Sequence, residues 1–338
     1  MAELRISLPT PVSGRLPVLD ELKGVAILLV ILYHGGGVLG WRNTLHFDLG
    51  VDIFVVLSGI GLALSSRYRG PGEFMARRLS RIMPAYWIVL TIYALGSISL
   101  LQRPTTATDL ILHYLGVHAW FGDAHAVSIN DSFWYITLIL TLYGLFCLVR
   151  PLLEHPARLL LAGSVISVTI ALGLFYWNQP AAFGFLGLRI PGFFVGLLIG
   201  QLLKTGRLSL PVGAALGAAL FVFVYVPYTQ GIVFHPTVAG LALMGIYALT
   251  IRPALPPGAQ GATGRVLKFL GDHSLEIFLI HQPLIRDYNV YLLGRWFNII
   301  QPGRWTLLVG MVIGLAVTLV ASVELRRMLQ KVPFLSKA

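Results

Sequence analysis

The chain has 338 residues, of which 56% are hydrophobic and only 12% are charged, and its mean hydropathy is +0.78. This composition excludes an ordinary soluble globular protein and predicts an integral membrane protein that crosses the bilayer several times. The net charge of +11 is spread over loops without a nucleic-acid-binding motif, so we expect no nucleic-acid partner, and a single cysteine excludes an internal disulfide framework.

About ten apolar runs of transmembrane length predict an all-α polytopic membrane fold. Lys and Arg gather in alternate connections, which by the positive-inside rule predicts cytoplasmic N- and C-termini and anionic lipids as neighbours. We expect one integral domain over 1–338, with a cytoplasmic segment at 1–21 and a cytoplasmic tail at 324–338. The predicted spans are 22–40, 48–66, 84–101, 132–149, 158–177, 183–203, 209–227, 232–251, 271–293 and 305–323.

The first span carries Lys23 near its cytoplasmic end and His34 toward the other end. Eleven helical steps separate them, which is about 16 Å and about three turns, so both side chains lie on nearly the same face. Ionisable groups at membrane depth usually line a cavity, pair with a partner or take part in chemistry. The sequence equally allows Lys23 to reach the headgroups and His34 to be a packing residue.

The second span places Asp48 and Asp52 near its outer end, at a depth comparable to that of His34. A carboxylate beside an imidazole fixes its tautomer and stabilises the imidazolium, which makes a histidine a general base. Asp48 is equally suited to cap the helix. Deeper in the span, Gly59 and Gly61 predict close helix packing and would also leave room for a ligand.

Arg77, Arg78 and Arg81 lie on one side of a predicted short helix at the cytoplasmic surface, which Pro84 should end. Three arginines so placed are suited to hold phosphate groups. They are equally typical of an interfacial helix that binds anionic lipid. The sequence leaves both interpretations open.

The connection between the third and fourth spans is rich in histidine and aspartate. Their spacing fits no standard ligand pattern, so we expect no metal site and interpret the segment as a polar loop over the entrance for a substrate. The residues are His113, His118, Asp123, His125 and Asp131.

Four motifs resemble those of the membrane-bound acyltransferase-3 family, in its order and context: LPVLDELKGVAILLVILYH, FDLGVDIFVVLSGIGLAL, EFMARRLSRIMPAYW and LGDHSLEIFLIHQPL. The resemblance covers nearly the whole chain and includes the ten-span count. It implies an O-acyltransferase of the bacterial inner membrane. Such an enzyme moves an acyl group, often acetyl, from cytoplasmic acyl-CoA to a hydroxyl of a carbohydrate or lipid-linked glycan. Acyl-CoA is then a donor substrate, and no permanently bound cofactor is expected.

The resemblance also implies roles for individual residues. His34 matches the family's essential histidine and Lys23 its basic partner, while the three arginines match the motif associated with the CoA phosphates. His281 matches the histidine of the ninth span, and Ser274 lies seven residues before it on the same helical face.

We expect His34 to take the proton from the acceptor hydroxyl, directly or through an acyl-histidine, with Asp52 beside it and His281 or Ser274 donating to the oxyanion. Many members carry a glutamate five residues after the fourth-span tryptophan. Here Trp134 is followed by Ile139 at that position, so the acid must be absent or supplied by Asp52 or Glu276. The alternative function is a transporter or flippase in which His34 and Asp52 relay protons.

Overall fold

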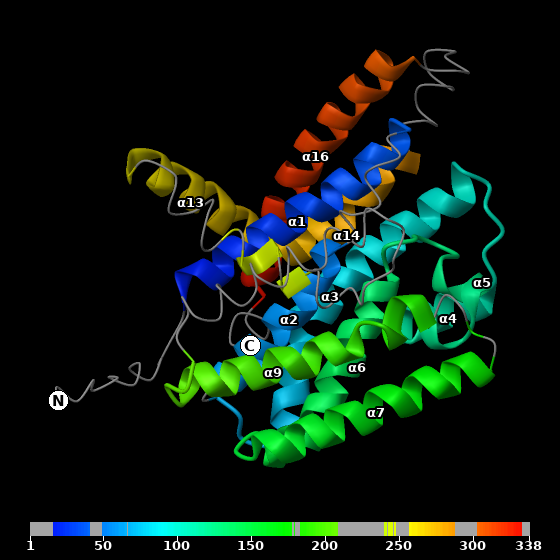
Figure 1. Cartoon of the computed structure of the whole chain (residues 1–338). Coiled ribbons are helices and arrows are strands. Elements are labelled where there is room, and N and C mark those ends of the chain that lie inside the picture. The colour runs from blue at the N-terminus through cyan, green and yellow to red at the C-terminus, as the bar shows by residue number, and fades with distance from the viewer. Residues whose placement is uncertain are drawn as a thin grey trace, which may run out of the picture.

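The structure is a computed structural model, and every element that it describes is helical. Figure 1 shows the helices α1 (Pro17–Val38), α2 (Leu49–Leu64), α3 (Pro71–Ser99), α4 (Ala107–Leu115), α5 (Asp123–Ala126), α6 (Trp134–Val149), α7 (Pro156–Tyr176), α9 (Ile190–Lys204), α13 (Pro257–Asp272), α14 (Ser274–Gln282) and α16 (Arg304–Gln330). The described residues are 16–40, 49–65, 67–177, 179, 183–208, 240–241, 243–245, 247, 257–287 and 303–332.

Within this part of the chain, five helical stretches are long and apolar enough to cross a membrane, and α2 is apolar but has only 16 residues. The prediction of an all-α integral membrane protein is therefore confirmed. The count of ten spans, the cytoplasmic termini and the single domain stay predictions, because the seventh and eighth spans lie almost entirely outside the described residues. The five stretches are Pro71–Ser99, Trp134–Leu152, Pro156–Tyr176, Gly184–Lys204 and Arg304–Gln330.

One predicted helix end was wrong: Pro84 lies inside α3 instead of ending a short helix. Helix α1 begins at Pro17 and α16 continues to Gln330, so both helices are longer than the predicted spans, and the cytoplasmic segment and tail stay predictions. A proline removes one main-chain hydrogen bond, and apolar surroundings favour keeping all the others in a continuous helix. Arg77, Arg78 and Arg81 therefore lie on the same continuous helix as the span that follows them.

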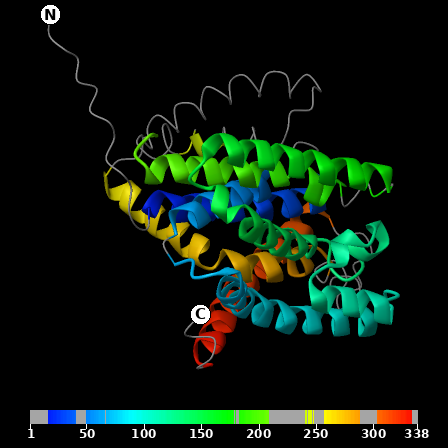
Figure 2. The ribbon, with the colours of Figure 1, turned by 90° about the horizontal axis from the view of Figure 1, so that it is seen from below.

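Helices α1 and α2 lie in the middle of the bundle, between α7 and α9 on one side and α3 on the other (Figure 2). Glycines let α2 and α9 touch through their backbones: a Cβ on Gly196 would lie 2.2 Å from the carbonyl oxygen of Val56. A Cβ on Gly59 would lie 2.4 Å from that of Phe193, so the predicted packing role of Gly59 is confirmed.

Helices α1 and α13 cross in the same way. A Cβ on Gly24 would lie 2.1 Å from the carbonyl oxygen of Leu267, and one on Gly271 would lie 2.1 Å from that of Asp20. No side chain fits between the two backbones at this crossing. Because α14 follows α13 after a single residue, the crossing fixes α14 beside α1, as Figure 1 shows.

Candidate active site

A hollow of about 660 Å³ opens between α1, α2, α3, α6, α14 and α16, at the end of α1 that is predicted to be cytoplasmic. A second hollow of about 690 Å³ adjoins it, because the two share several lining residues. We call the two together the basic chamber. The shared cationic side chains are Lys23, Arg78, Arg81 and Arg326.

The predicted basic residues differ in how they meet this chamber. Arg78 lines both hollows, and its guanidinium lies over the rings of Phe74 and Tyr143, at 5.4 and 5.3 Å from their centroids. Arg81 lines both hollows as well, whereas Arg77 lines only the second and is bonded to Glu73. The structure thus brings Lys23 and the arginine motif together, although 54 positions separate Lys23 from Arg77 in the sequence.

Arg326 is a member of this cluster that sequence reasoning missed. It lies in α16 and donates to the main-chain carbonyl of Asp272. In the sequence it is one of several cations after the last span, and the positive-inside rule already accounts for those. Arg326 can be distinguished from the other C-terminal cations only because the structure places it in the lining of the chamber.

One part of the chamber wall contacts the predicted histidines. Tyr135 and Phe278 line the chamber, with ring centroids 4.6 Å apart, and the Phe278 ring is 5.7 Å from that of His281. The rings of His281 and His34 are 5.1 Å apart. The two histidines, from helices that are far apart in the sequence, therefore lie side by side beyond an aromatic pair.

The protonation of His281 follows from its partners. Its Nδ1 lies 2.8 Å from the carbonyl oxygen of Phe278 and 3.1 Å from that of Ile277. A carbonyl oxygen can only accept, so Nδ1 carries the proton and the neutral ring has its lone pair on Nε2. Within the described part of the chain, this buried Nε2 has no hydrogen-bond partner. Neutral His281 is thus an acceptor at Nε2, which speaks against its predicted role as an oxyanion donor.

Asp52 lies beside an arginine in the structure. Gly50 faces α1, and Asp52 lies two residues further, about 200 degrees around the helix. Its carboxylate is 3.6 Å from Nε of Arg189, whose guanidinium lies over the ring of Trp134. Arg189 is therefore one partner of Asp52, and the pairing of Asp52 with His34 stays a prediction. Asp48 lies outside the described residues.

Ser274 lines the basic chamber in the first turn of α14. It precedes His281 by seven residues, which is about 10 Å along a helix. Ser274 therefore lies about two helical turns from His281, on the side of the chamber, and its predicted contact with an oxyanion stays a prediction.

Comparison with known proteins assigns the chain to a family. Residues 16–323 match the model of a family described as an acyltransferase domain. The chain belongs to this acyltransferase family. The resemblance inferred from the sequence is thereby confirmed, as is the prediction of an enzyme. Family membership also favours acyl transfer over the transporter alternative.

Three relatives show the range of this acyltransferase family. A putative membrane-bound transacylase, BcsY of Komagataeibacter xylinus, is 25% identical over 81% of this chain and 74% of its own length. The exopolysaccharide production protein ExoZ of Rhizobium meliloti is 25% identical over 74% of this chain and 80% of its own. The peptidoglycan O-acetyltransferase OatA of Listeria monocytogenes is 22% identical over 86% of this chain and 51% of its own. No solved structure matches the chain.

The acyltransferase departs from the common family pattern at Ile139, and the structure shows what surrounds that position. Ile139 and Glu276 line the same hollow from α6 and α14. The Glu276 side chain is buried, and its Oε2 has no hydrogen-bond partner among the described residues. Of the two replacements expected from the sequence, Glu276 thus faces the chamber, whereas Asp52 does not line it.

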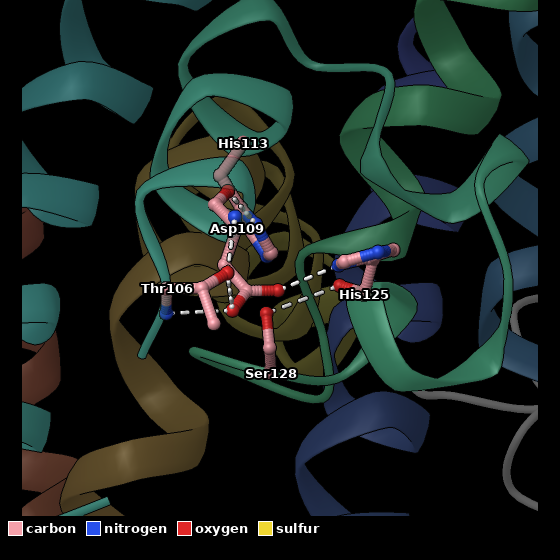
Figure 3. Close-up of polar contacts among 5 residues, drawn as sticks. All are labelled: Thr106, Asp109, His113, His125 and Ser128. Carbon is pink, nitrogen blue, oxygen red and sulfur yellow. Dashed lines mark hydrogen bonds and ion pairs between the residues drawn. The ribbon is translucent and has the colours of Figure 1, made fainter. Parts of the chain in front are cut away.

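The histidine-rich connection of the acyltransferase is ordered by Asp109 (Figure 3). Thr106 N–H and Oγ donate to Asp109, whose other oxygen lies 2.7 Å from Nδ1 of His125. His113 stacks on His118, with ring centroids 3.8 Å apart. Among the described residues, no group of three or more His, Cys, Asp or Glu side chains could hold a metal ion.

The same connection gives the protein a predicted acid sensitivity. Burial lowers the pKa of His113 from 6.5 to about 4, although its hydrogen bond to the Asp109 carbonyl acts in the other direction. Burial and the charge of His113 also lower the pKa of His118. Burial alone would raise the pKa of Asp109, but hydrogen bonds from Thr106 and His125 outweigh it and lower that pKa to about 2.

Between pH 6.5 and 4 the unfolded chain therefore binds a proton that folded His113 does not, and stability falls as the pH falls. Asp109 adds to this loss only below its ordinary value of 3.8. We expect acidification from pH 6.5 to 5 to cost roughly 2 kcal/mol, measured as a lower melting temperature in detergent. His113→Gln should flatten this dependence, while His155→Gln, at an exposed histidine, should leave it unchanged. An equal slope in both variants would contradict the assignment.

Proposed function

We propose that the protein moves an acetyl group from cytoplasmic acetyl-CoA to a hydroxyl of an envelope carbohydrate, as an integral protein of the bacterial inner membrane. The observation that carries this proposal is a series of contacts: Tyr135 and Phe278 line the basic chamber, and the Phe278 ring contacts His281, which lies beside His34. Acetyl-CoA has the matching order, with phosphates at one end and the thioester at the other.

The chamber supports the donor half of the proposal. Guanidinium groups bind phosphate oxygens through paired, charge-assisted hydrogen bonds, and an ammonium binds them as a point charge. Arg78, Arg81 and Lys23 would hold the CoA phosphates, and the pantetheine arm would extend along α1. Lys23 and His34 are about 16 Å apart along the helix, a reach that an extended arm can span. Basic residues outside the chamber would meet anionic lipid headgroups.

The histidine pair supports the chemical half. Two imidazoles joined by an N–H···N hydrogen bond have centroids about 5 Å apart, since the bond itself is about 3 Å long. The ring centroids of His34 and His281 are 5.1 Å apart, and Nε2 of neutral His281 is a hydrogen-bond acceptor. In the structure Nε2 of His281 has no hydrogen-bond partner among the described residues, so this bond would form when the substrates bind. His281 would then accept the N–H of His34 and leave the other nitrogen of His34 as the base.

In the proposed reaction, His34 takes the proton of the acceptor hydroxyl while that oxygen attacks the thioester carbonyl. The tetrahedral intermediate collapses with loss of the carbon–sulfur bond. The CoA thiolate leaves and takes the proton back from His34, so that CoA thiol and an acetyl ester are the products. The relatives named for exopolysaccharide production and peptidoglycan O-acetylation support a polysaccharide as the acceptor.

Removal of the chamber's shared arginines tests this function. We expect Arg78→Ala combined with Arg81→Ala to raise the KM for acetyl-CoA at least tenfold, because charge-assisted hydrogen bonds each contribute about 1.5–3 kcal/mol. The assay is incorporation of labelled acetyl into envelope material by membrane vesicles. Arg69→Ala is the matched control, because Arg69 is exposed, lines neither hollow and lies 4.0 Å from Glu73. An unchanged KM in the double variant would refute the donor site.

A further inference from the structure

Two buried amide groups meet at the outer end of α14, next to His281. The segment that precedes α6 docks there: the Ser132 hydroxyl donates to Oε1 of Gln282, and the Ser132 N–H donates to Oδ1 of Asn130 at 2.9 Å. Between them in the sequence, Asp131 forms an ion pair with Arg286, which lies one turn beyond Gln282. Ser132 thus holds both amides by their oxygens.

This arrangement determines what the two amides present. A main-chain N–H can only donate, so the Asn130 side chain must turn its oxygen toward Ser132 and its NH₂ group away. In the structure the Ser132 hydroxyl donates to Oε1 of Gln282, so the Gln282 NH₂ group likewise faces away from Ser132. Within the described residues, neither Nδ2 of Asn130 nor Nε2 of Gln282 has a hydrogen-bond partner, and each residue is only 1% exposed.

Unpaired NH₂ groups in such a place are costly. Leaving a buried donor without an acceptor costs about 1–3 kcal/mol, so native structures rarely keep one without a reason. Here both amides contact Ser132 through their oxygens, and α14 is held in place because Tyr93 donates to the carbonyl of Ile280. The helix end therefore cannot easily turn to relieve them.

The chemistry of the spot indicates its ligand. It offers N–H donors, and its nearest charges, on Asp131 and Arg286, are paired with each other. A neutral ligand rich in oxygen atoms fits such donors better than an anion, which would seek an unpaired cation. Gln282 follows His281 directly, so a ligand held here would lie close to the histidine pair on the side away from the basic chamber.

We propose that Asn130 and Gln282 form the binding site for the acceptor, donating hydrogen bonds to hydroxyl or ring oxygens of a polyhydroxylated sugar. This inference rests on the proposed function and adds the acceptor site to it. Ser132 is the positioning residue that aims both amides. The acetyl donor would enter from the chamber end and the sugar from the opposite end of α14.

Near-isosteric substitutions test the site. Asn130→Asp keeps the oxygen that Ser132 needs and removes the NH₂, and Gln282→Met removes the amide without adding charge. In membranes given labelled acetyl-CoA, we expect each variant to lower acetyl incorporation into envelope glycan about tenfold. The Kd of the purified full-length variants for acetyl-CoA should stay within twofold of wild type. Slow release of CoA by hydrolysis, which needs no sugar, should persist.

Gln179→Glu is the matched control, since Gln179 donates to a main-chain carbonyl after α7, away from α14, and should leave every readout unchanged. Incorporation within threefold of wild type in both variants would overturn the acceptor site. Parallel loss of acetyl-CoA binding would also overturn it, because that outcome indicates a structural role. If wild-type membranes incorporate no label, the proposed function itself fails and this inference fails with it.

Discussion

His34→Ala should lower acetyl transfer from acetyl-CoA by at least about a hundredfold, because a positioned general base contributes about 10²–10⁴ to a rate. In the proposed reaction His34 receives the proton of the acceptor hydroxyl, and its described ring contacts are with Tyr33 and His281. The measurement is incorporation of labelled acetyl into envelope material by inside-out vesicles, which receive the donor on the cytoplasmic side only.

His155→Ala is the control for this experiment, because His155 is exposed and lies on the connection before α7. The Kd of His34→Ala for acetyl-CoA should remain close to that of wild type, since the proposed phosphate site lies in the basic chamber, which His34 does not line. Equal incorporation with and without His34, at matched protein levels, would remove the histidine from the chemistry and reopen a transport function.

Two substitutions at His281 should separate the roles that its ring can play. In His281→Asn the side-chain NH₂ takes the place of Nδ1–H and can still donate to the carbonyls of Ile277 and Phe278. The Nε2 lone pair is lost. In His281→Gln the amide instead reaches the place of Nε2 and can donate there. We expect both variants to lose acetyl transfer by at least about a hundredfold, measured in the same vesicle assay.

The comparison between the two variants decides the mechanism. If the histidine stabilised an oxyanion by donating from Nε2, His281→Gln would keep a tenth or more of the wild-type rate while His281→Asn would not. That result would contradict the acceptor role and restore the oxyanion role. Acetyl-CoA binding should be retained by both, which shows that the loss is not a folding defect.

Much of the fold could be predicted from the sequence because a membrane imposes a length on each apolar segment. Runs of about twenty apolar residues correspond to α6, α7 and α16 within a few positions at their starts. The end of α16 was missed because helices continue beyond the hydrocarbon when charged residues can reach water. Pro84 was misjudged because the rule that prolines end helices comes mainly from soluble proteins.

The candidate site was predictable where residues share a helix or a motif. Lys23 and His34 could be placed on one face by counting turns, and the resemblance supplied His281. The pairing of Asp52 with Arg189 could not be predicted, since it depends on which face α2 turns toward α9. The tautomer of His281 and the orientations of the Asn130 and Gln282 amides could not be predicted either. They depend on individual hydrogen bonds that only the folded structure shows.

The aromatic pair between the chamber and the histidines has a consequence for the membrane itself. An enzyme that takes its two substrates from opposite sides holds an open path through the bilayer unless something blocks it, and such a path would dissipate the proton gradient. Tyr135 and Phe278 line the chamber with ring centroids 4.6 Å apart, on the side of the histidines. If acetyl groups cross here as proposed, these two rings would have to admit a slender thioester arm and exclude a continuous column of water, so that the membrane stays energised.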